Sequence, residues 1–258
     1  MTDTVASKPH LSASSIGMFL KCPRQYEFRY MQKIKSPPNA AMTQGSVVHK
    51  AVETNFRQKI ETGVDLPLDS VKDACADAHK DMFTKDVILG EGDTIGKLKD
   101  QAVSLVEIHH KEIAPRVQPA AVEQKFNLDL GEEFPFTLLG FIDLVEKDGT
   151  IADLKVKGKR VSQADLDEDM QFTCYSLARR IITGEAEPGM RMDILLKNKI
   201  PKAVQMTTTR TNADCRFFLG QVEQVGNAIK TGIFYPNTNG WHCSENWCGY
   251  WDMCKGAR

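Results

Sequence analysis

The feature that most constrains the fold is a β-hairpin predicted near the middle of the chain. The dipeptide Asp148-Gly149 is a strong signal for a two-residue hairpin turn. It lies between two short, apolar, β-prone segments, 141–145 and 151–156. We therefore expect the rest of the chain to be organised around these two antiparallel strands.

Three charged side chains converge on the predicted hairpin. Asp153 and Lys155 are two residues apart in one strand and share a face, and Asp143 on the neighbouring strand can face the same side. A bound divalent cation would relieve the repulsion between the two carboxylates, and hard oxygen ligands favour Mg²⁺ or Mn²⁺. Asp-x-Lys is also common on solvated strand faces, so this motif alone leaves both interpretations open.

The net charge of the 258-residue chain is −1, so a nucleic-acid binder of this composition must concentrate its positive charge locally. Candidates that follow the hairpin are Lys157, Lys159 and Arg160, which could equally form a solvated face. No apolar run is long enough to span a membrane, and the N-terminus lacks the order of a signal peptide. We expect a cytoplasmic protein with reduced thiols and no membrane partner.

The hydrophobic period changes along the chain from helical to alternating, which predicts an α/β fold. Predicted helices start at Ser12 and at Gln44, and others cover 69–83, 98–113, 167–182 and 214–230. Predicted strands cover 122–130, 134–139, 141–145, 151–156, 190–196 and 204–209. We expect these strands to form a mixed central sheet flanked by helices.

The length of the chain fits one large domain. We expect a disordered tail at 1–10 and a single domain at 11–258. Its parts would be a helical N-terminal part at 11–115, the catalytic sheet and helix at 120–210, and a C-terminal helix with a cysteine-rich end at 214–258.

The placement of the cysteines predicts a second metal site. Cys243, Cys248 and Cys254 crowd into the last sixteen residues, whereas Cys22 lies near the other end of the chain. Structural zinc sites usually show two close cysteine pairs, and a one-plus-three set suits a [4Fe–4S] cluster at least as well. Zinc, or unligated thiols around a tryptophan-rich core, are the alternatives. Either metal would join the two ends of the chain.

Several short motifs then occur in a fixed order. The residues are His49, Asp143, Asp153, Leu154, Lys155, Gln171 and Tyr175, flanked by the split cysteine set. This order resembles the RecB/Cas4-like branch of the PD-(D/E)XK nuclease superfamily with an iron–sulfur cluster, which includes many phage-type exonucleases. The resemblance extends from about Ser12 to Cys254 and implies the restriction-endonuclease-like core of that superfamily.

The resemblance implies a set of metal ligands. Asp143 and Asp153 would bind the catalytic Mg²⁺ or Mn²⁺. The carbonyl group of Leu154 and the imidazole of His49 would be further ligands. These roles agree with the chemistry of phosphodiester hydrolysis, which needs a metal to activate water and to neutralise phosphate oxygens.

The resemblance also implies roles for the remaining motif residues. Lys155 would orient or deprotonate the attacking water and offset the charge that builds up on the phosphate. Gln171 and Tyr175 would brace the site and contact the DNA strand.

Two features depart from the family's pattern. Leu154 and Val156 stand where the family often has Tyr and Thr, which changes local packing rather than the reacting groups. The four-residue gap between Cys243 and Cys248 is longer than the common gap of two. His242 is therefore an alternative to Cys243 as the ligand that completes the cluster.

Taken together, the resemblance implies a Mg²⁺- or Mn²⁺-dependent deoxyribonuclease of a bacterial or phage-infected cell. We expect an exonuclease that acts on single-stranded DNA or DNA ends in recombination, repair or replication. The chain has no Gly-x₄-Gly-Lys-Ser/Thr sequence, so a helicase partner would be a separate polypeptide, and a recombinase or single-strand annealing protein is another candidate partner. Alternatives are a Cas4-like endonuclease or adaptation factor, a non-catalytic iron–sulfur DNA-binding subunit, and a zinc-clamped RNA-processing enzyme.

Overall fold

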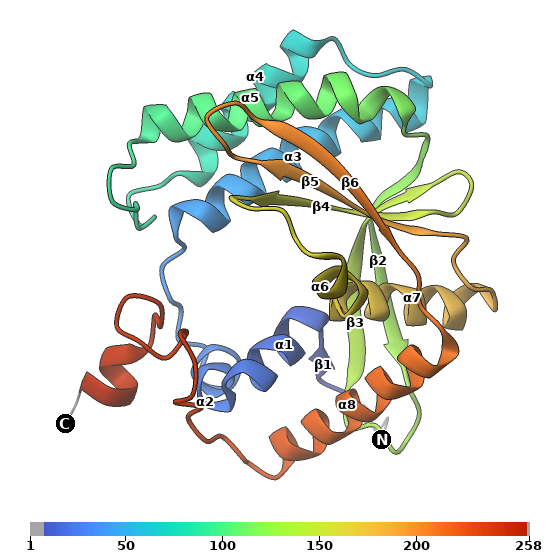
Figure 1. Cartoon of the computed structure of the whole chain (residues 1–258). Coiled ribbons are helices and arrows are strands. Elements are labelled where there is room, and N and C mark those ends of the chain that lie inside the picture. The colour runs from blue at the N-terminus through green and yellow to red at the C-terminus, as the bar shows by residue number, and fades with distance from the viewer. Residues whose placement is uncertain (1–7, 257–258) are drawn as a thin grey trace, which may run out of the picture.

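The structure of the protein is a computed structural model, which describes residues 8–256. At its centre lies a six-stranded mixed sheet (Figure 1). The strands are β1 (His10–Leu11), β2 (Pro119–Asp129), β3 (Thr137–Glu146), β4 (Ile151–Lys157), β5 (Met190–Leu196) and β6 (Lys202–Thr208). β1 and β3 are parallel, as are β4 and β5, and the other neighbours are antiparallel. The predicted α/β fold with a mixed central sheet is confirmed.

Helices cover both faces of the sheet. The helices are α1 (Ala13–Lys21), α2 (Pro23–Tyr26), α3 (Ala40–Thr62), α4 (Leu68–Met82), α5 (Ile95–Glu112), α6 (Gln163–Asp167), α7 (Met170–Thr183) and α8 (Asn212–Lys230). The apolar side chains of α3, α4 and α5 form one core with the sheet, and those of α1, α7 and α8 form another. Among residues 8–256, none of the helices is long and apolar enough to cross a membrane.

Side-chain caps fix the starts of the two helices nearest the centre. The Ser12 hydroxyl accepts from the Ser15 N–H at 3.2 Å, and the Ser15 hydroxyl accepts from the Ser12 N–H at 2.8 Å. Asp169 caps α7, because its carboxylate accepts from the N–H of Gln171 at 2.8 Å and of Phe172 at 3.3 Å. The helix predicted at 167–182 therefore begins later, and α6 precedes it as a separate short helix.

The predicted strands at 134–139 and 141–145 correspond to one strand, β3, which begins three residues later than predicted, at Thr137. β2 keeps one register against β3 from Asp129↔Thr137 to Ala121↔Val145, and Gly140 is paired with Phe126, so Gly140 does not interrupt the ladder. The predicted hairpin between β3 and β4 is confirmed, and Gly149 in its turn has a φ of 90°, which favours glycine.

The predicted tail at 1–10 needs a correction at its end. Residues 1–7 lie outside the described residues. His10, however, belongs to β1, and the Thr137 N–H donates to the Pro9 carbonyl at 2.9 Å. The chain is thus part of the sheet from residue 9 onward, while the single domain at 11–258 stays a prediction.

β3 has three strand partners, and they leave part of one edge open. β2 covers one edge along the whole strand. On the other edge, β1 ends with Leu11 opposite Leu138, and the pairing with β4 reaches only as far as Leu144, opposite Ala152. Between them, residues 139–143 have no strand partner on this edge in the described part of the chain. Figure 1 shows β3 and β4 running in diverging directions, which opens this gap.

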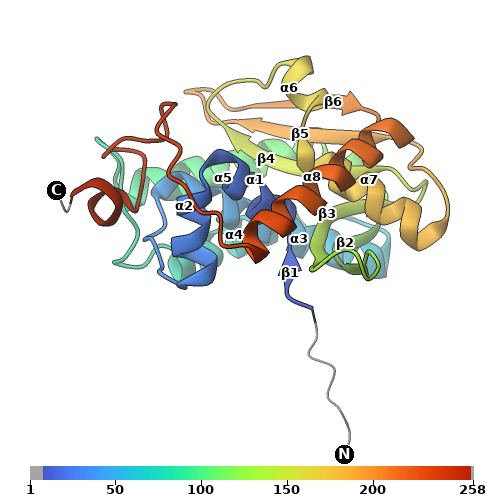
Figure 2. The ribbon, with the colours of Figure 1, turned by 90° about the horizontal axis from the view of Figure 1, so that it is seen from below.

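The C-terminal segment lies beside α2, near the start of the chain (Figure 2). The Asn237 side chain donates to the Lys21 carbonyl at 3.0 Å, and the Tyr250 hydroxyl donates to the Ile34 carbonyl at 3.0 Å. Segments more than two hundred residues apart in sequence are therefore in contact.

Candidate active site

β3 and β4 pair only near their turn and then separate, and we call the point where they separate the fork. Next to the turn the strands pair normally, with Leu144 opposite Ala152. One residue further on, the Asp143 carboxylate replaces a backbone acceptor: its Oδ2 accepts a hydrogen bond from the Leu154 N–H at 3.3 Å. The Asp143 side chain is therefore held between β3 and β4.

A line of polar contacts runs from Asp153 on β4 to Tyr175 on α7. Lys155 Nζ lies 2.8 Å from Asp153 Oδ2 and donates to Gln171 Oε1 at 2.8 Å. Gln171 Nε2 in turn donates to Tyr175 Oη at 2.5 Å. Gln171 and Tyr175 lie one helical turn apart, as their spacing predicts. These contacts hold the Lys155 ammonium group beside the carboxylates.

The Asp153 carboxylate is buried without full compensation. The residue is 1% exposed. Within residues 8–256, neither of its oxygens accepts a well-directed hydrogen bond, although the Lys155 ammonium lies at ion-pair distance. Burial, followed by the charge of Asp143, raises the pKa of Asp153 to about 7. A bound cation would stabilise the ionised form, so this carboxylate fits a metal ligand.

His49 on α3 and Glu123 on β2 extend the site. His49 Nδ1 lies 3.4 Å from Asp143 Oδ2. One ligand atom each of His49, Glu123 and Asp143 lie within 4.8 Å of one another. Burial lowers the pKa of His49, although Asp153 opposes this shift, so the imidazole is neutral at neutral pH and can act as a ligand. The residues that could hold a metal therefore include one, Glu123, that the sequence did not single out.

Glu123 reaches the site because of its place in the sheet. The register places Val122 opposite Leu144 and Gln124 opposite Ile142, so Glu123 lies opposite Asp143. Its φ of 50° is unusual for a residue other than glycine. Neither the register nor this backbone angle has a signal in the sequence, so the sequence alone does not identify Glu123.

The described residues leave room for an ion among these groups. A cavity of about 30 Å³ is lined by His49, Glu123, Asp143 and Asp153. This volume exceeds the space that one water molecule needs. Lys155 keeps its positive charge and can bind an anion: burial lowers its pKa, but the neighbouring carboxylates, Asp153 first among them, together outweigh burial and the net shift is upward. The site thus combines clustered cation ligands with one positive charge.

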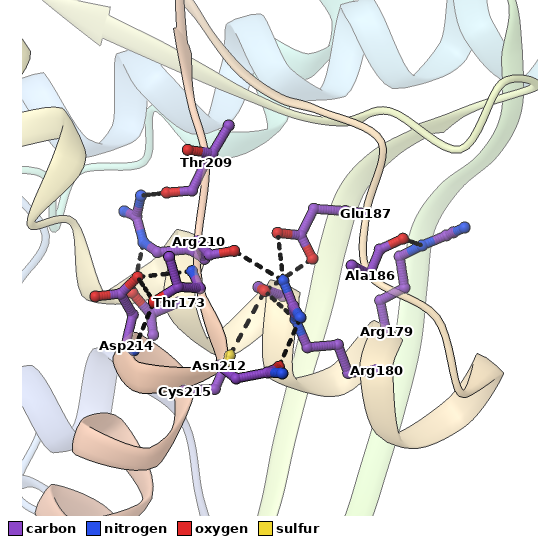
Figure 3. A network of polar contacts seen from close by, with 12 residues as sticks. Thr173, Arg179, Arg180, Ala186, Glu187, Thr209, Arg210, Asn212, Asp214 and Cys215 are labelled. Atoms are coloured by element: carbon purple, nitrogen blue, oxygen red, sulfur yellow. Dashed lines mark hydrogen bonds and ion pairs between the residues drawn. The ribbon is translucent and has the colours of Figure 1, made fainter.

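A buried arginine fixes the position of α7. Arg210 donates to the carbonyl oxygens of Leu166 and Asp169, both at 2.9 Å, and to Thr173 Oγ1 at 2.8 Å. Figure 3 shows its contacts with Thr173 and Thr209. Because Leu166 and Asp169 bound the turn before α7, Arg210 sets where α7 begins and hence where Gln171 lies.

The predicted DNA-binding residues lie at and beyond the end of β4. Lys157 is exposed and lines an open groove together with Lys155. Lys159 and Arg160 are exposed in the loop that follows. Their contact with DNA stays a prediction.

The structure brings the four predicted cysteines together. Cys22, Cys243, Cys248 and Cys254 line one cavity of about 20 Å³, and His242 lines it as well. Burial, followed by the neighbouring Cys22 and Cys248, raises the pKa of the Cys254 thiol. Two of the sulfurs accept hydrogen bonds, Cys248 Sγ from the Gln25 amide at 3.1 Å and Cys22 Sγ from the Asn237 N–H at 3.4 Å.

Comparison with protein families identifies the class to which this fold and site belong. The sequence model of a family described as "PD-(D/E)XK nuclease superfamily" matches residues 10–255, nearly the whole chain. The protein belongs to the PD-(D/E)XK nuclease superfamily. Its members are metal-dependent nucleases, and family membership implies DNA as the substrate.

One solved structure shows the same fold. A crystal structure described as a "Putative exonuclease" from Eubacterium rectale matches with a TM-score of 0.60 and 17% identity, and the match covers 100% of this chain and 93% of that one. A second, described as SSO0001, has a TM-score of 0.35 and 9% identity over 94% of this chain and 96% of that one, which is too low to support a conclusion about the fold. No curated protein matches the sequence.

Proposed function

We propose that the protein is a Mg²⁺- or Mn²⁺-dependent exonuclease of the RecB/Cas4-like iron–sulfur branch, which hydrolyses single-stranded DNA or DNA ends. The observation that carries this proposal is the buried Asp153 carboxylate, which faces Lys155 and shares a cavity with Asp143 and His49. In a metal-free setting these groups are poorly compensated, and a divalent cation with a phosphate would satisfy them.

His49, Glu123, Asp143 and Asp153 would hold the metal, with the carbonyl group of Leu154 as a further ligand. When bound, the metal would supply positive charge that acidifies water and neutralises phosphate oxygens. Three hard carboxylates and one imidazole suit Mg²⁺ or Mn²⁺.

Lys155 would place its ammonium group against the attacking water and the phosphate, where negative charge develops. Gln171 accepts from Lys155 and donates to Tyr175, which fixes the direction of the Lys155 side chain. Gln171 and Tyr175 would therefore act as positioning residues. Both line an open groove, and the half-buried Gln171 would be the one that contacts a DNA strand there.

The test is digestion of end-labelled DNA by purified protein with Mg²⁺ or Mn²⁺. We expect cleavage by the wild type, and loss of at least about 100-fold in rate for Asp153→Ala and Lys155→Ala, because transition-state charge is then uncompensated. Lys111→Ala, on the exposed face of α5, is the matched control and should cut at the wild-type rate. Cleavage by both active-site variants at the wild-type rate would contradict the proposed site.

Circular single-stranded DNA separates exonuclease from endonuclease action. An exonuclease leaves circles intact while it degrades linear strands. Cleavage of circles would instead favour the Cas4-like endonuclease alternative. We also propose that the protein acts in recombination, repair or replication together with a helicase or annealing protein. Co-purification of such a protein with this one tests this part of the proposal.

We further propose that the four cysteines bind a [4Fe–4S] cluster. Tetrahedral zinc with bonds of about 2.3 Å would hold sulfurs roughly 3.8 Å apart. Among the described residues, no three of these cysteines have their sulfurs within 4.8 Å of one another, so their spacing is wider than tetrahedral zinc needs and fits a cluster or unligated thiols. The N–H groups of Gln25 and Asn237 that point at Cys248 and Cys22 are typical of a cluster site, because hydrogen bonds to sulfur tune such clusters.

Iron content and colour test the cluster, since a cluster gives a brown protein and zinc a colourless one. Cys243→Ala and His242→Ala identify the fourth ligand. His242 Nε2 is buried without a partner in the described part of the chain and lines the same cavity. We expect Cys243→Ala to lose iron and His242→Ala to retain it; the reverse would make His242 the ligand.

A further inference from the structure

Two open grooves meet at the candidate active site. The first, here the basic groove, has a volume of about 760 Å³ and includes Lys50, Lys155 and Lys157 in its lining. The second, here the β3-edge groove, has a volume of about 690 Å³ and includes Asp143 and Phe141. Both volumes lie in the range that a ligand of nucleotide size requires. A strand that passes the site would therefore occupy both grooves.

The β3-edge groove lies at the gap in the sheet. Its lining includes His10 of β1, Ser12 directly after β1, and Leu139 to Phe141 from the unpaired edge of β3. α7 contributes Gln171 and Tyr175. The edge of β3 is unpaired between β1 and β4, and this leaves the space next to Asp143.

The two grooves differ in charge. The lining of the β3-edge groove contains no lysine or arginine among the described residues, and it contains the carboxylates of Asp143 and Asp169. Three lysines line the basic groove together with the carboxylates of Glu53 and Glu123, so its lining is the more positive of the two. A phosphate backbone is attracted to the basic groove and repelled from the β3-edge groove. The β3-edge groove instead suits an uncharged, flat group such as a nucleobase.

Phe141 provides an apolar face in the β3-edge groove. It is 46% exposed, whereas the other aromatic residues of this groove, Phe126 and Tyr175, are 4% and 2% exposed. Phe141 precedes Asp143 by two residues in β3, so both side chains lie on the same side of the strand. A large exposed aromatic side chain next to a reaction site favours a role in binding.

We propose that the β3-edge groove receives the base of a nucleotide next to the scissile phosphate, stacked on the ring of Phe141. This inference rests on the proposed nuclease function and specifies its substrate. Stacking on an aromatic ring is tolerant of sequence, because every base has a flat face. A base can enter the groove only when it is unpaired, so the substrates are single strands and frayed duplex ends.

The test compares Phe141→Ala and Phe141→Trp in the full-length protein with Phe217→Ala as matched control. Phe217 is a phenylalanine on α8 that is 71% exposed and lines a different groove. Loss of stacking should raise the KM of Phe141→Ala for a single-stranded oligonucleotide about ten-fold. Phe141→Trp and Phe217→Ala should behave like the wild type, and thermal unfolding checks that all variants are folded.

A second measurement tests whether Phe141 contacts one particular base of the substrate. An abasic nucleotide is placed at each position of the oligonucleotide in turn. At one position next to the cleaved bond, we expect the abasic nucleotide to raise the KM of the wild type about ten-fold. The KM of Phe141→Ala should not rise further, because the ring that stacks on the missing base is already absent.

The outcomes are distinguishable from those of the proposed function. If the wild type cleaves DNA and depends on Lys155, but Phe141→Ala shows an unchanged KM or the full abasic penalty, this inference is wrong and the nuclease function stands. If the wild type neither cleaves nor binds DNA, both are wrong.

Discussion

At the scale of single residues, the site depends on groups that are held in unfavourable surroundings. The Asp153 carboxylate has a pKa of about 7, above its ordinary value of 3.8, because it is buried beside Asp143. Gly140 leaves the space that the Phe126 ring occupies. Asp153 lowers the stability of the metal-free protein, and position 140 accepts only glycine without a clash. Both features are expected of residues at a reaction site.

The raised pKa of Asp153 predicts how the metal-free protein responds to pH. The folded protein holds this proton more tightly than the unfolded chain, so stability decreases as pH rises from about 4 to about 7. Asp153→Asn removes the titrating group. Its unfolding temperature at pH 8 in the presence of a chelator should exceed that of the wild type by at least ~2 °C, and the difference should shrink towards pH 4.

Thermal melts from pH 4 to pH 8 measure this effect. Asp73→Asn is the control, because this carboxyl group is exposed on α4. Identical pH dependence in Asp153→Asn and the wild type would show that Asp153 does not titrate in this range.

Gly140→Ala should disturb the site through two aromatic rings. A Cβ atom at this position would overlap the Phe126 ring. Phe126 packs edge-on against Tyr175, with ring centroids 6.5 Å apart, and Tyr175 binds Gln171. We expect a loss of about 1–3 kcal/mol in unfolding free energy and a lower kcat.

Denaturant unfolding and cleavage assays check this prediction. Gly220→Ala is the control, since nothing lies within 4 Å of its added Cβ atom. A Gly140→Ala variant with the stability and kcat of the wild type would show that the Phe126 ring moves without affecting Tyr175.

At the scale of elements, the relation between α7 and β4 decides the geometry of the site. β4 carries Asp153 and Lys155, and α7 carries the Gln171 that binds Lys155. The start of α7 is fixed by the Asp169 cap and by Arg210, which is buried. The element is therefore positioned by polar contacts at one end as well as by its apolar face.

Arg210→Met should release the start of α7. Carbonyl groups of Leu166 and Asp169 would lose a charged donor while they stay partly buried, at a cost of about 3 kcal/mol. We expect a reduced kcat as well, because Gln171 loses its fixed position. Arg179→Met is the control, because this half-buried neighbour makes a solvent-exposed hydrogen bond to the Ala186 carbonyl, and it should be close to the wild type in both measurements. Equal stability of the two variants would contradict the assigned role of Arg210.

At the scale of the whole molecule, the cysteine cavity joins the two ends of the described chain. α2 and the C-terminal segment meet there, and Tyr250 packs on Phe28 with ring centroids 5.5 Å apart. A metal group bound at this point would link the two ends of the chain into one long loop. Such a link reduces the conformational entropy of the unfolded chain and so stabilises the fold.

Cys248→Ala should therefore bleach and destabilise the protein, with a drop of at least ~5 °C in Tm, since ligation contributes to folding. Cys75→Ala is the control, because Cys75 is buried in the core of α3, α4 and α5, away from the cavity. Limited proteolysis should cut Cys248→Ala first between α8 and the C-terminus. An unchanged Tm and proteolytic pattern would argue against a structural metal.

Local patterns in the sequence predict much of this architecture. Alternating and helical periods predicted the elements, and β5 occupies 190–196 as predicted. The order of His49, Asp143, Asp153, Lys155 and Gln171 indicated the superfamily to which the chain belongs. These features are local, because side-chain periodicity and short motifs depend on neighbours within a few residues.

Other features arise only when distant strands and helices pack. Glu123 joins the site through the register of β2 against β3, and the β3-edge groove exists because β1 and β4 stop short of each other. Cys22 meets the last cysteines through contacts across the whole chain. The physical reason is that register and strand divergence are set by the packing of both cores at once, and no segment carries that information alone.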